Sequence, residues 1–242
     1  MTSTKLIYLE QQHLYESEAT IESVTQDGDQ LVIVLDETIL YPQGGGQPYD
    51  NGFIKSGDTI FEVTEVRWVE GKVQHKGKYL QGEPLNPLQK VTVHVDEPRR
   101  KLHARLHSAG HIIDNVVQEL NLSWQASKGY HYPDSPYVEY EGEITPEQKI
   151  ALPAQIEKRA NELIQASFET KAFIIKPEEI QKYCLFPNSN FPKDKPLRIV
   201  IVAGEKGCPC GGTHVSNIQE IHHMNIPKIE SKGGRIKVKY NL

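Results

Sequence analysis

Apolar and polar residues alternate over short stretches in the first 95 residues of the chain. The segment ATIESVTQDGDQLVIVLDETILY predicts two strands joined by a turn at Gly28, and the second strand is rich in β-branched residues. The segment VTVHVD at 91–96 alternates in the same way. Many short strands with regular turns are typical of a small barrel or sandwich. We therefore predict a β-rich N-terminal domain over residues 1–95 that is similar to a small β-barrel.

The period of the pattern changes after Asp96. In RRKLHARLHSAGHIIDNVVQELNL, apolar residues recur at steps of three and four, which predicts an amphipathic helix. A second helix is predicted from Thr145, because TPEQ supplies an N-cap, a proline at the first helical position and a reciprocal glutamine. Pro153 is expected to kink this helix or to mark its real start. The segments KAFIIK and LRIVIVAG and the C-terminus predict strands, so residues 96–242 read as an α+β domain ending in a basic hairpin.

Composition narrows the classes of protein that fit. The 27 basic and 32 acidic residues give a net charge of −5, which argues against a protein that binds nucleic acid over its whole surface. No apolar stretch approaches the roughly 20 residues that span a bilayer, and the N-terminus lacks the pattern of a signal peptide. We expect a cytoplasmic protein without a membrane partner. Three cysteines are too few for a disulfide scaffold, so reduced thiols are expected.

Histidines and cysteines recur at metal-binding spacing in two separate segments. The predicted first helix carries histidines at 103, 107 and 111, in one row along a single face. Two imidazoles four residues apart on a helix can bind one metal ion, although surface helices also carry histidines by chance. Cys210 and His214 are four apart in CPCGGTHV, which follows a predicted strand. One Zn²⁺ per chain is therefore predicted, because three nitrogens and one sulfur suit tetrahedral zinc. The predicted ligands are His107, His111, Cys210 and His214.

The sequence leaves the roles of two residues near these ligands open. Cys208 is either a substitute ligand or an ordinary loop residue, because its spacing to His214 does not match that of the helical pair. His103 is read as a side chain behind the ligands or as one that faces RNA. Gly110, inside the predicted helix, costs roughly 1 kcal/mol against alanine, so close packing or approach of a substrate is expected there.

Three motifs together resemble the editing domain of alanyl-tRNA synthetase. The segments HSAGH at 107–111 and CGGTH at 210–214 resemble its zinc site. LDETILYPQGGGQPYDNG at 35–52 resembles its Asp-x-Thr, Tyr-Pro and Gly-Gly-Gln-x-x-Asp-x-Gly segment, in the same order. Only about 35 residues precede this segment, too few for an aminoacylation domain. The sequence is therefore identified as a member of the freestanding AlaX-type editing proteins, of medium length.

The resemblance implies an aminoacyl-tRNA deacylase without a nucleotide cofactor. Its relatives hydrolyse mischarged tRNA(Ala) at the acceptor end, chiefly seryl-tRNA(Ala) and in some members glycyl-tRNA(Ala), while sparing alanyl-tRNA(Ala). A pocket that hydrogen-bonds the serine hydroxyl can reject alanine by roughly 10⁴ to 10⁵, whereas an apolar synthetase pocket rejects serine by only ~10²-fold.

The resemblance also implies the residues that meet the substrate. It places Thr38 and Gln47 in the pocket, and places Gly44, Gly45 and Gly46 where backbone approaches the tRNA 3′ end. The plain alternatives are a strand-end threonine, a turn glutamine and a tight turn. No catalytic residue is predicted. We hypothesise that zinc orients the terminal ribose or the aminoacyl group, while the glycine-rich loop places the water.

Basic residues near the C-terminus are predicted to contact tRNA phosphates, with a steep dependence on salt. They are Lys232, Arg235, Lys237 and Lys239. A solvated charged face is the plain alternative. Two other functions stay open at this point: editing of another mischarged tRNA such as Ser-tRNA(Thr), and a non-catalytic zinc-stabilised tRNA-binding module.

Overall fold

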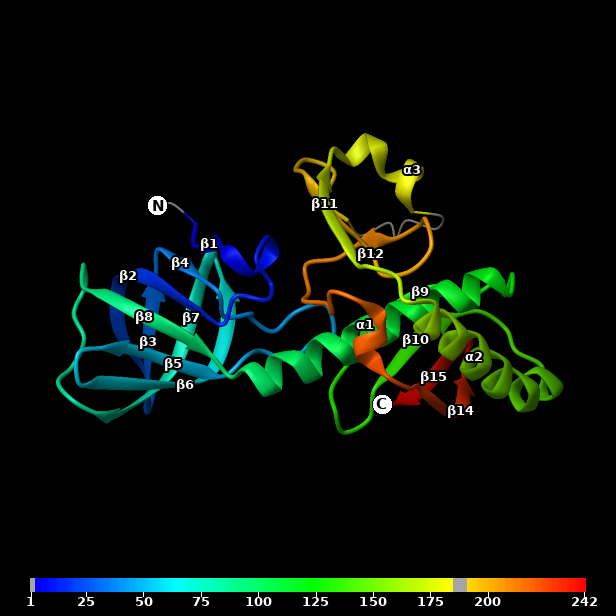
Figure 1. The fold of residues 1–242 in the computed structure, drawn as a ribbon, viewed down its shortest axis with the longest axis horizontal. Helices are drawn as coiled ribbons and strands as arrows, with labels where there is room; N and C mark the ends of the chain where they lie inside the picture. The colour runs from blue at the N-terminus through cyan, green and yellow to red at the C-terminus, as the bar shows by residue number, and fades with distance from the viewer. Residues whose placement is uncertain (1–2, 185–190) are drawn as a thin grey trace. The chain divides into compact units, whose positions relative to one another are not determined.

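The computed structural model describes residues 3–184 and 191–242 and divides the chain into two compact units (Figure 1). The first unit comprises Met1–Gly44 and Pro48–Lys101, and the second comprises Gly45–Gln47 and Leu102–Leu242. The middle of the glycine-rich motif thus belongs to the second unit, while its flanks belong to the first.

The first unit is a closed six-stranded barrel in the order β2-β3-β7-β6-β5-β8, with antiparallel neighbours throughout (blue to cyan in Figure 1). Its strands are β2 (Glu16–Asp27), β3 (Gln30–Leu35), β5 (Gly52–Ser56), β6 (Thr59–Val69), β7 (Lys72–Gln81) and β8 (Lys90–Val95). A short parallel pair, β1 (Lys5–Leu6) with β4 (Glu37–Thr38), and the turn η1 (Ile7–Leu9) complete the unit. Alternate residues along each strand point inward, and the interior is filled by Ile21, Ile33, Ile54, Phe61 and Val93. The expectation of a small N-terminal barrel is confirmed.

The second unit combines helices with two antiparallel sheets, in the orders β14-β15-β10-β9 and β11-β12-β13. Its helical elements are α1 (Glu97–Glu119, in this unit from Leu102 on), α2 (Pro146–Ala166), η2 (Pro177–Glu179), α3 (Ile180–Tyr183) and η3 (Ile218–Ile221). Its strands are β9 (Gln125–Tyr130), β10 (Tyr137–Glu141), β11 (Lys171–Ile175), β12 (Leu197–Ile201), β13 (Cys208–Pro209), β14 (Asn225–Lys232) and β15 (Arg235–Asn241). The α+β class is therefore confirmed.

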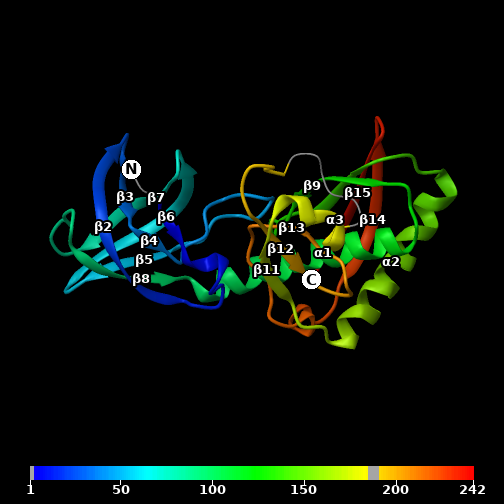
Figure 2. The same cartoon turned by 90° about the horizontal axis from the view of Figure 1, so that it is seen from above.

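The predicted start of α2 is confirmed by its cap. Thr145 and Gln148 form the reciprocal pair of hydrogen bonds of a capping box, and Pro146 occupies the first turn. Pro153 lies inside the helix, so the alternative that it marks the real start is wrong. The apolar face of α2 packs beside β14 (Figure 2), and Ile156 and Leu163 join one core with α1 and the inner face of the four-stranded sheet. Among the described residues, no helix is both long and apolar enough to cross a membrane.

Candidate metal centre

Four side chains from α1 and from the loop after β13 converge in the second unit. His107 and His111 lie one turn apart on α1, and Cys210 and His214 lie four residues apart in the loop. One ligand atom from each of the four falls within 4.8 Å of every other. The two sequence motifs, about 100 residues apart, therefore meet as one cluster that could bind a metal ion.

The distances within this cluster suit a small tetrahedral ion. Sγ of Cys210 lies 3.5 Å from Nε2 of His107 and 3.4 Å from Nε2 of His214. A tetrahedron with metal–sulfur and metal–nitrogen bonds of about 2.3 and 2.05 Å has sulfur–nitrogen edges of about 3.5 Å. The donor set of three imidazoles and one thiol is of the zinc type.

Gln47 fixes the tautomer of His107. Its side-chain oxygen lies 2.7 Å from Nδ1 of His107 and also accepts from the backbone nitrogen of Thr213 at 3.0 Å, while its amide nitrogen donates to the Thr213 hydroxyl at 2.9 Å. An amide oxygen only accepts, so Nδ1 of His107 carries the proton. Nε2 is left with its lone pair towards Cys210. Gln47 and Thr213 are fully buried.

The loop that carries Cys210 and His214 is held on both sides. Ser108 Oγ lies 3.1 Å from Nδ1 of His214, so the other ring nitrogen, Nε2, faces Cys210. The Arg198 guanidinium donates to the backbone oxygens of Cys210 and Gly212 at 2.9 and 3.1 Å. A ligand histidine with its second nitrogen hydrogen-bonded is oriented before any metal arrives.

Two glycines leave room for this arrangement. A Cβ at Gly212 would lie 2.1 Å from Cε1 of His107 and 2.9 Å from the Gln47 side-chain oxygen. A Cβ at Gly46 would lie 2.3 Å from the carbonyl oxygen of Gly129, and Gly46 has a φ of +78°, which L side chains rarely adopt. Gly46 therefore serves both as a turn residue and as a point of close backbone approach. The exposed Gly45, with a φ of 52°, precedes it.

A fourth imidazole, that of His131, was not foreseen from the sequence. Its ring stacks on that of His107, with centroids 4.7 Å apart and planes 20° apart. It also explains Gly110, because a Cβ there would lie 2.3 Å from Cε1 of His131. The expectation of close packing at Gly110 is thus confirmed. His131 lies far from both motifs in sequence, and only its place one residue after a strand could have drawn attention to it.

Burial sets the protonation of the cluster. It lowers the pKa of His107 and of His214 well below the usual value, and that of His111 to about 4. Burial raises the pKa of both the Cys208 and Cys210 thiols. The three imidazoles are therefore neutral and ready to bind a metal at pH 7, whereas Cys210 must release its proton to do so.

The structure reduces the alternatives for the roles of Cys208 and His103. Sγ of Cys208 lies 3.5 Å from Nδ1 of His111, close to the centre but outside the set of four. His103 is buried, with 1% of its surface exposed, so it does not present its ring at the surface of the protein.

Thr38 lies inside the barrel unit. Nδ1 of His75 lies 3.0 Å from the carbonyl oxygen of Ile33, so it carries the ring proton and Nε2 accepts from the Thr38 hydroxyl at 2.9 Å. The same hydroxyl accepts from the Leu40 nitrogen at 3.1 Å. The hydroxyl proton of Thr38 is thus engaged within the barrel, and its substrate role stays a prediction. Gly44 also belongs to this unit and accepts a hydrogen bond from the Tyr41 hydroxyl.

The rest of the glycine-rich motif is structural. Asp50 is fully buried and binds the guanidinium of Arg100, which also donates to the carbonyl oxygens of Gln12 and Ile39. A Cβ at Gly52 would lie 2.0 Å from the His94 carbonyl oxygen, so β5 and β8 can pair only with glycine there.

The four basic residues predicted to contact tRNA lie at or near the hairpin β14–β15. Glu139, itself 5% exposed, binds Arg235 at 2.8 Å and Lys237 at 3.6 Å. Lys239 lies 3.8 Å from Glu230, and Lys232 is exposed at the end of β14. Three of the four cations are thus partly neutralised, and their role in binding tRNA stays a prediction.

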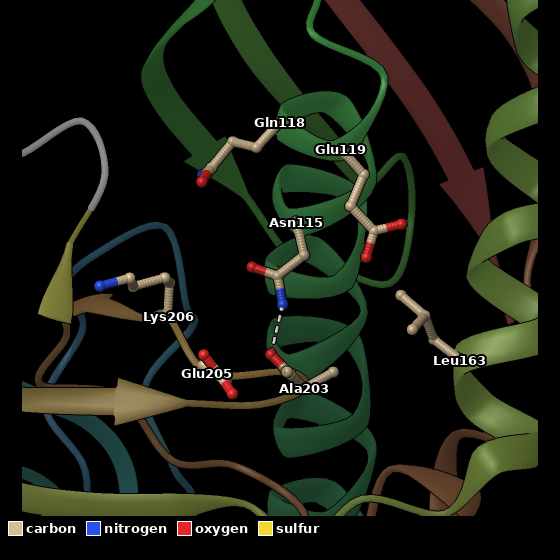
Figure 3. Close-up of a pocket in the computed structure, with 8 residues that line it drawn as sticks. Asn115, Gln118, Glu119, Leu163, Ala203, Glu205 and Lys206 are labelled. Atoms are coloured by element: carbon tan, nitrogen blue, oxygen red, sulfur yellow. Dashed lines mark hydrogen bonds between the residues drawn. The ribbon is translucent and has the colours of Figure 1, made fainter.

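A separate hollow of about 200 Å³ opens along the C-terminal part of α1 (Figure 3). Asn115 donates to the Ala203 carbonyl oxygen at 3.0 Å across one side of it. None of the predicted site residues lines this hollow; its lining is Asn115, Gln118, Glu119, Leu163, Ala203, Gly204, Glu205 and Lys206.

Comparison with known proteins matches two models of the tRNA synthetase class. Residues 4–99 match the class II (A) tRNA synthetases, and residues 197–237 match the second additional domain of threonyl and alanyl tRNA synthetases. The second match includes Cys210 and His214 of the metal centre. Both matched segments are thus similar to parts of class II tRNA synthetases.

Whole-length relatives narrow this class to one family. The alanyl-tRNA editing protein AlaX-M of Methanosarcina barkeri is 32% identical over 95% of this chain and 95% of its own. That of Saccharolobus solfataricus is 31% identical over 99% of both chains. An alanine–tRNA ligase of Methanothrix thermoacetophila is 30% identical over 82% of this chain but only 21% of its own. The chain belongs to the family of alanyl-tRNA editing proteins of the AlaX type.

Proposed function

We propose that the protein hydrolyses the ester of mischarged tRNA(Ala), chiefly seryl-tRNA(Ala) and in addition glycyl-tRNA(Ala), while it spares alanyl-tRNA(Ala). One observation carries the proposal: a centre of three histidines and one cysteine, built by both editing motifs, in a chain that matches alanyl-tRNA editing proteins along its whole length. Its place of action is the cytoplasm, where tRNA is charged.

Zn²⁺ is the metal that we propose for the centre, held by His107, His111, Cys210 and His214. The sulfur–nitrogen distances, the donor types and the neutral imidazoles support this choice. A zinc ion polarises an oxygen atom bound to it and lowers the pKa of a bound water. Four protein ligands favour an ion that organises the site.

The residues around the centre would position the aminoacyl end. Gln47 holds His107, and Gly46 brings the backbone of the motif against Gly129, beside His131. We propose that the loop Gly44–Gln47 lies along the 3′ end of tRNA(Ala). A role for Thr38 in reading the serine hydroxyl rests on the motif that it shares with this family.

The basic residues of the C-terminal hairpin are proposed to contact phosphates of the acceptor end. Lys232 is exposed at the end of β14, whereas Arg235 and Lys237 form ion pairs with Glu139. Phosphate contacts would then require these two side chains to exchange a carboxylate for a phosphate. Charge removal should weaken binding of all tRNAs alike and reduce the salt dependence.

The experiment that tests the function is a deacylation assay. Ser-tRNA(Ala), Gly-tRNA(Ala), Ala-tRNA(Ala) and Ser-tRNA(Thr) are incubated with the protein as isolated, after chelation and after return of Zn²⁺. We expect loss of serine and glycine from tRNA(Ala), with alanine spared, and we expect chelation to abolish it. A preference for Ser-tRNA(Thr) would show that the protein edits another mischarged tRNA. Tight tRNA binding without turnover of any ester would show that the protein is a binding module and not an enzyme.

A further inference from the structure

His131 lies directly after β9 and is held against His107 and the glycine-rich loop. Its ring stacks on His107, and its backbone nitrogen donates to the Gly46 carbonyl oxygen at 2.9 Å. Only 5% of its surface is exposed. The residue is therefore fixed between the glycine-rich loop and a metal ligand, although the function described so far gives it no task.

Hydrogen bonds settle which nitrogen of His131 carries the proton. The Tyr240 hydroxyl donates to the carbonyl oxygen of Leu106 at 2.9 Å, so its oxygen can accept from Nδ1 of His131 at 2.7 Å. A neutral imidazole carries one proton, and these two hydrogen bonds place it on Nδ1. Nε2 of His131 is then an acceptor with a lone pair.

This lone pair has no hydrogen-bond partner within the described parts of the chain. Nε2 of His131 is not one of the described polar side-chain atoms that lack both a hydrogen-bond partner and contact with solvent. The atom is thus reachable from outside in a side chain that is otherwise buried. A hydrogen-bond donor of a bound ligand could therefore reach this acceptor.

Two glycines form a cradle around the ring. A Cβ at Gly110 would lie 2.3 Å from Cε1, and a Cβ at Gly129 would lie 2.3 Å from Nε2 itself. Both positions therefore exclude any other residue while His131 keeps this place. At Gly129 the missing side chain also leaves Nε2 unscreened.

We propose that Nε2 of His131 accepts a hydrogen bond from the α-ammonium group of the aminoacyl end of the substrate. The inference rests on the proposed function and deepens it. An ammonium donor is favoured over a neutral one, because charge-assisted hydrogen bonds are roughly twice as strong and an imidazole acceptor adds no competing charge. A hydroxyl of the terminal ribose is the other donor of suitable chemistry at this end.

The proposal separates His131 from residues that select the amino acid. Serine, glycine and alanine all carry the α-ammonium group, so loss of Nε2 should weaken binding of their esters by the same factor. A residue that reads the serine hydroxyl would instead change the ratio between them.

The test measures binding without turnover. The probes are tRNA(Ala) carrying serine, glycine or alanine through a non-hydrolysable 3′ amide, each bound to the wild-type protein and to His131→Phe, His131→Gln and His223→Phe. We expect His131→Phe to raise Kd about 10- to 100-fold for all three probes, since it keeps a ring for stacking and removes the acceptor. His131→Gln should restore part of the affinity. His223→Phe, at an exposed histidine of the same unit, should change nothing.

Two modified probes identify the donor. If the α-ammonium is the partner, N-acetylation of the seryl probe weakens wild-type binding and abolishes the difference between the wild-type protein and His131→Phe. If the 2′-hydroxyl is the partner, a 2′-deoxy terminal nucleotide does so instead, and the ammonium assignment is overturned. Metal content and circular dichroism accompany every variant.

Equal Kd values for wild-type protein and a metal-loaded His131→Phe would overturn the inference while the deacylase function stands. A wild-type protein that hydrolyses no ester would instead overturn the function, and the amide probes would still test His131. Should His131→Phe lose its fold or its metal, the wild-type protein decides alone: binding that neither modified probe weakens overturns the inference.

Discussion

Gln47 and His107 share a 2.7 Å hydrogen bond although 60 residues separate them in sequence. The same glutamine oxygen also accepts from Thr213, which is 166 residues away. One buried amide therefore joins the glycine-rich motif to both halves of the metal centre. The three motifs of the sequence are thus connected. Gln47 of the glycine-rich motif orients His107 of the HSAGH motif, beside the loop that the CGGTH motif forms.

Substitution of Gln47 by leucine should weaken metal binding. Gln47→Leu keeps the size of the side chain but removes the acceptor that holds Nδ1 of His107, and loss of such a partner typically costs 10- to 100-fold in metal affinity. Competition against a chromophoric chelator measures the change. Gln43→Leu, at an exposed glutamine of the same segment, should have no effect. Unchanged metal affinity together with lost deacylation would instead place Gln47 on the substrate.

The adjacent glycines of the metal loop should respond oppositely to alanine. A Cβ at Gly212 would overlap His107, whereas at Gly211 nothing lies within 4 Å. We expect Gly212→Ala to displace His107 or the loop and to lower metal stoichiometry well below one per chain. Gly211→Ala should retain the metal and the wild-type Tm. Elemental analysis and thermal unfolding of the two purified variants compare them directly, and a metal-replete Gly212→Ala would refute the packing argument.

The elements and ligands that were predicted from the sequence are those with local signals. The capping box at Thr145 and the four-residue spacing of His107 and His111 are read within one helical turn, and the structure has both. A common site for the HSAGH and CGGTH motifs was predicted because together they supply four metal-binding atoms.

What the sequence could not provide were contacts between distant residues. The amide of Gln47 reads as a turn glutamine until Thr213 and His107 are seen around it. His131 gave no signal, because its task depends on Tyr240 and on two glycines from other elements. The contact of the Thr38 hydroxyl with His75, 37 residues away, likewise has no local signal in the sequence.

Thr38→Val tests a barrel role against a substrate role. The change leaves Nε2 of His75 and the Leu40 nitrogen without a partner, so we expect stability to fall by about 1–3 kcal/mol. Urea unfolding measures this, with Thr25→Val at an exposed position of β2 as the control. If Thr38 also reads the serine hydroxyl, the ratio of kcat/KM for Ser-tRNA(Ala) over Ala-tRNA(Ala) falls with it. An unchanged ratio at reduced stability would leave Thr38 with the barrel role alone.

The stability of the chain should depend on pH through His75. Burial lowers the pKa of His75 from 6.5 to about 4, while the carbonyl of Ile33 opposes the shift. Between these two pH values the unfolded chain binds more protons than the folded one, so stability is complete above pH 6.5 and falls as pH drops towards 4. This group contributes up to about 1.4 kcal/mol per pH unit in that window. His75→Asn should therefore be less stable at pH 7 but lose less stability between pH 7 and pH 5. Urea unfolding of both proteins, with chelator present so that no metal titrates, gives the two slopes. Equal pH dependences of stability for the two proteins would show that His75 does not take up a proton on unfolding in this pH range.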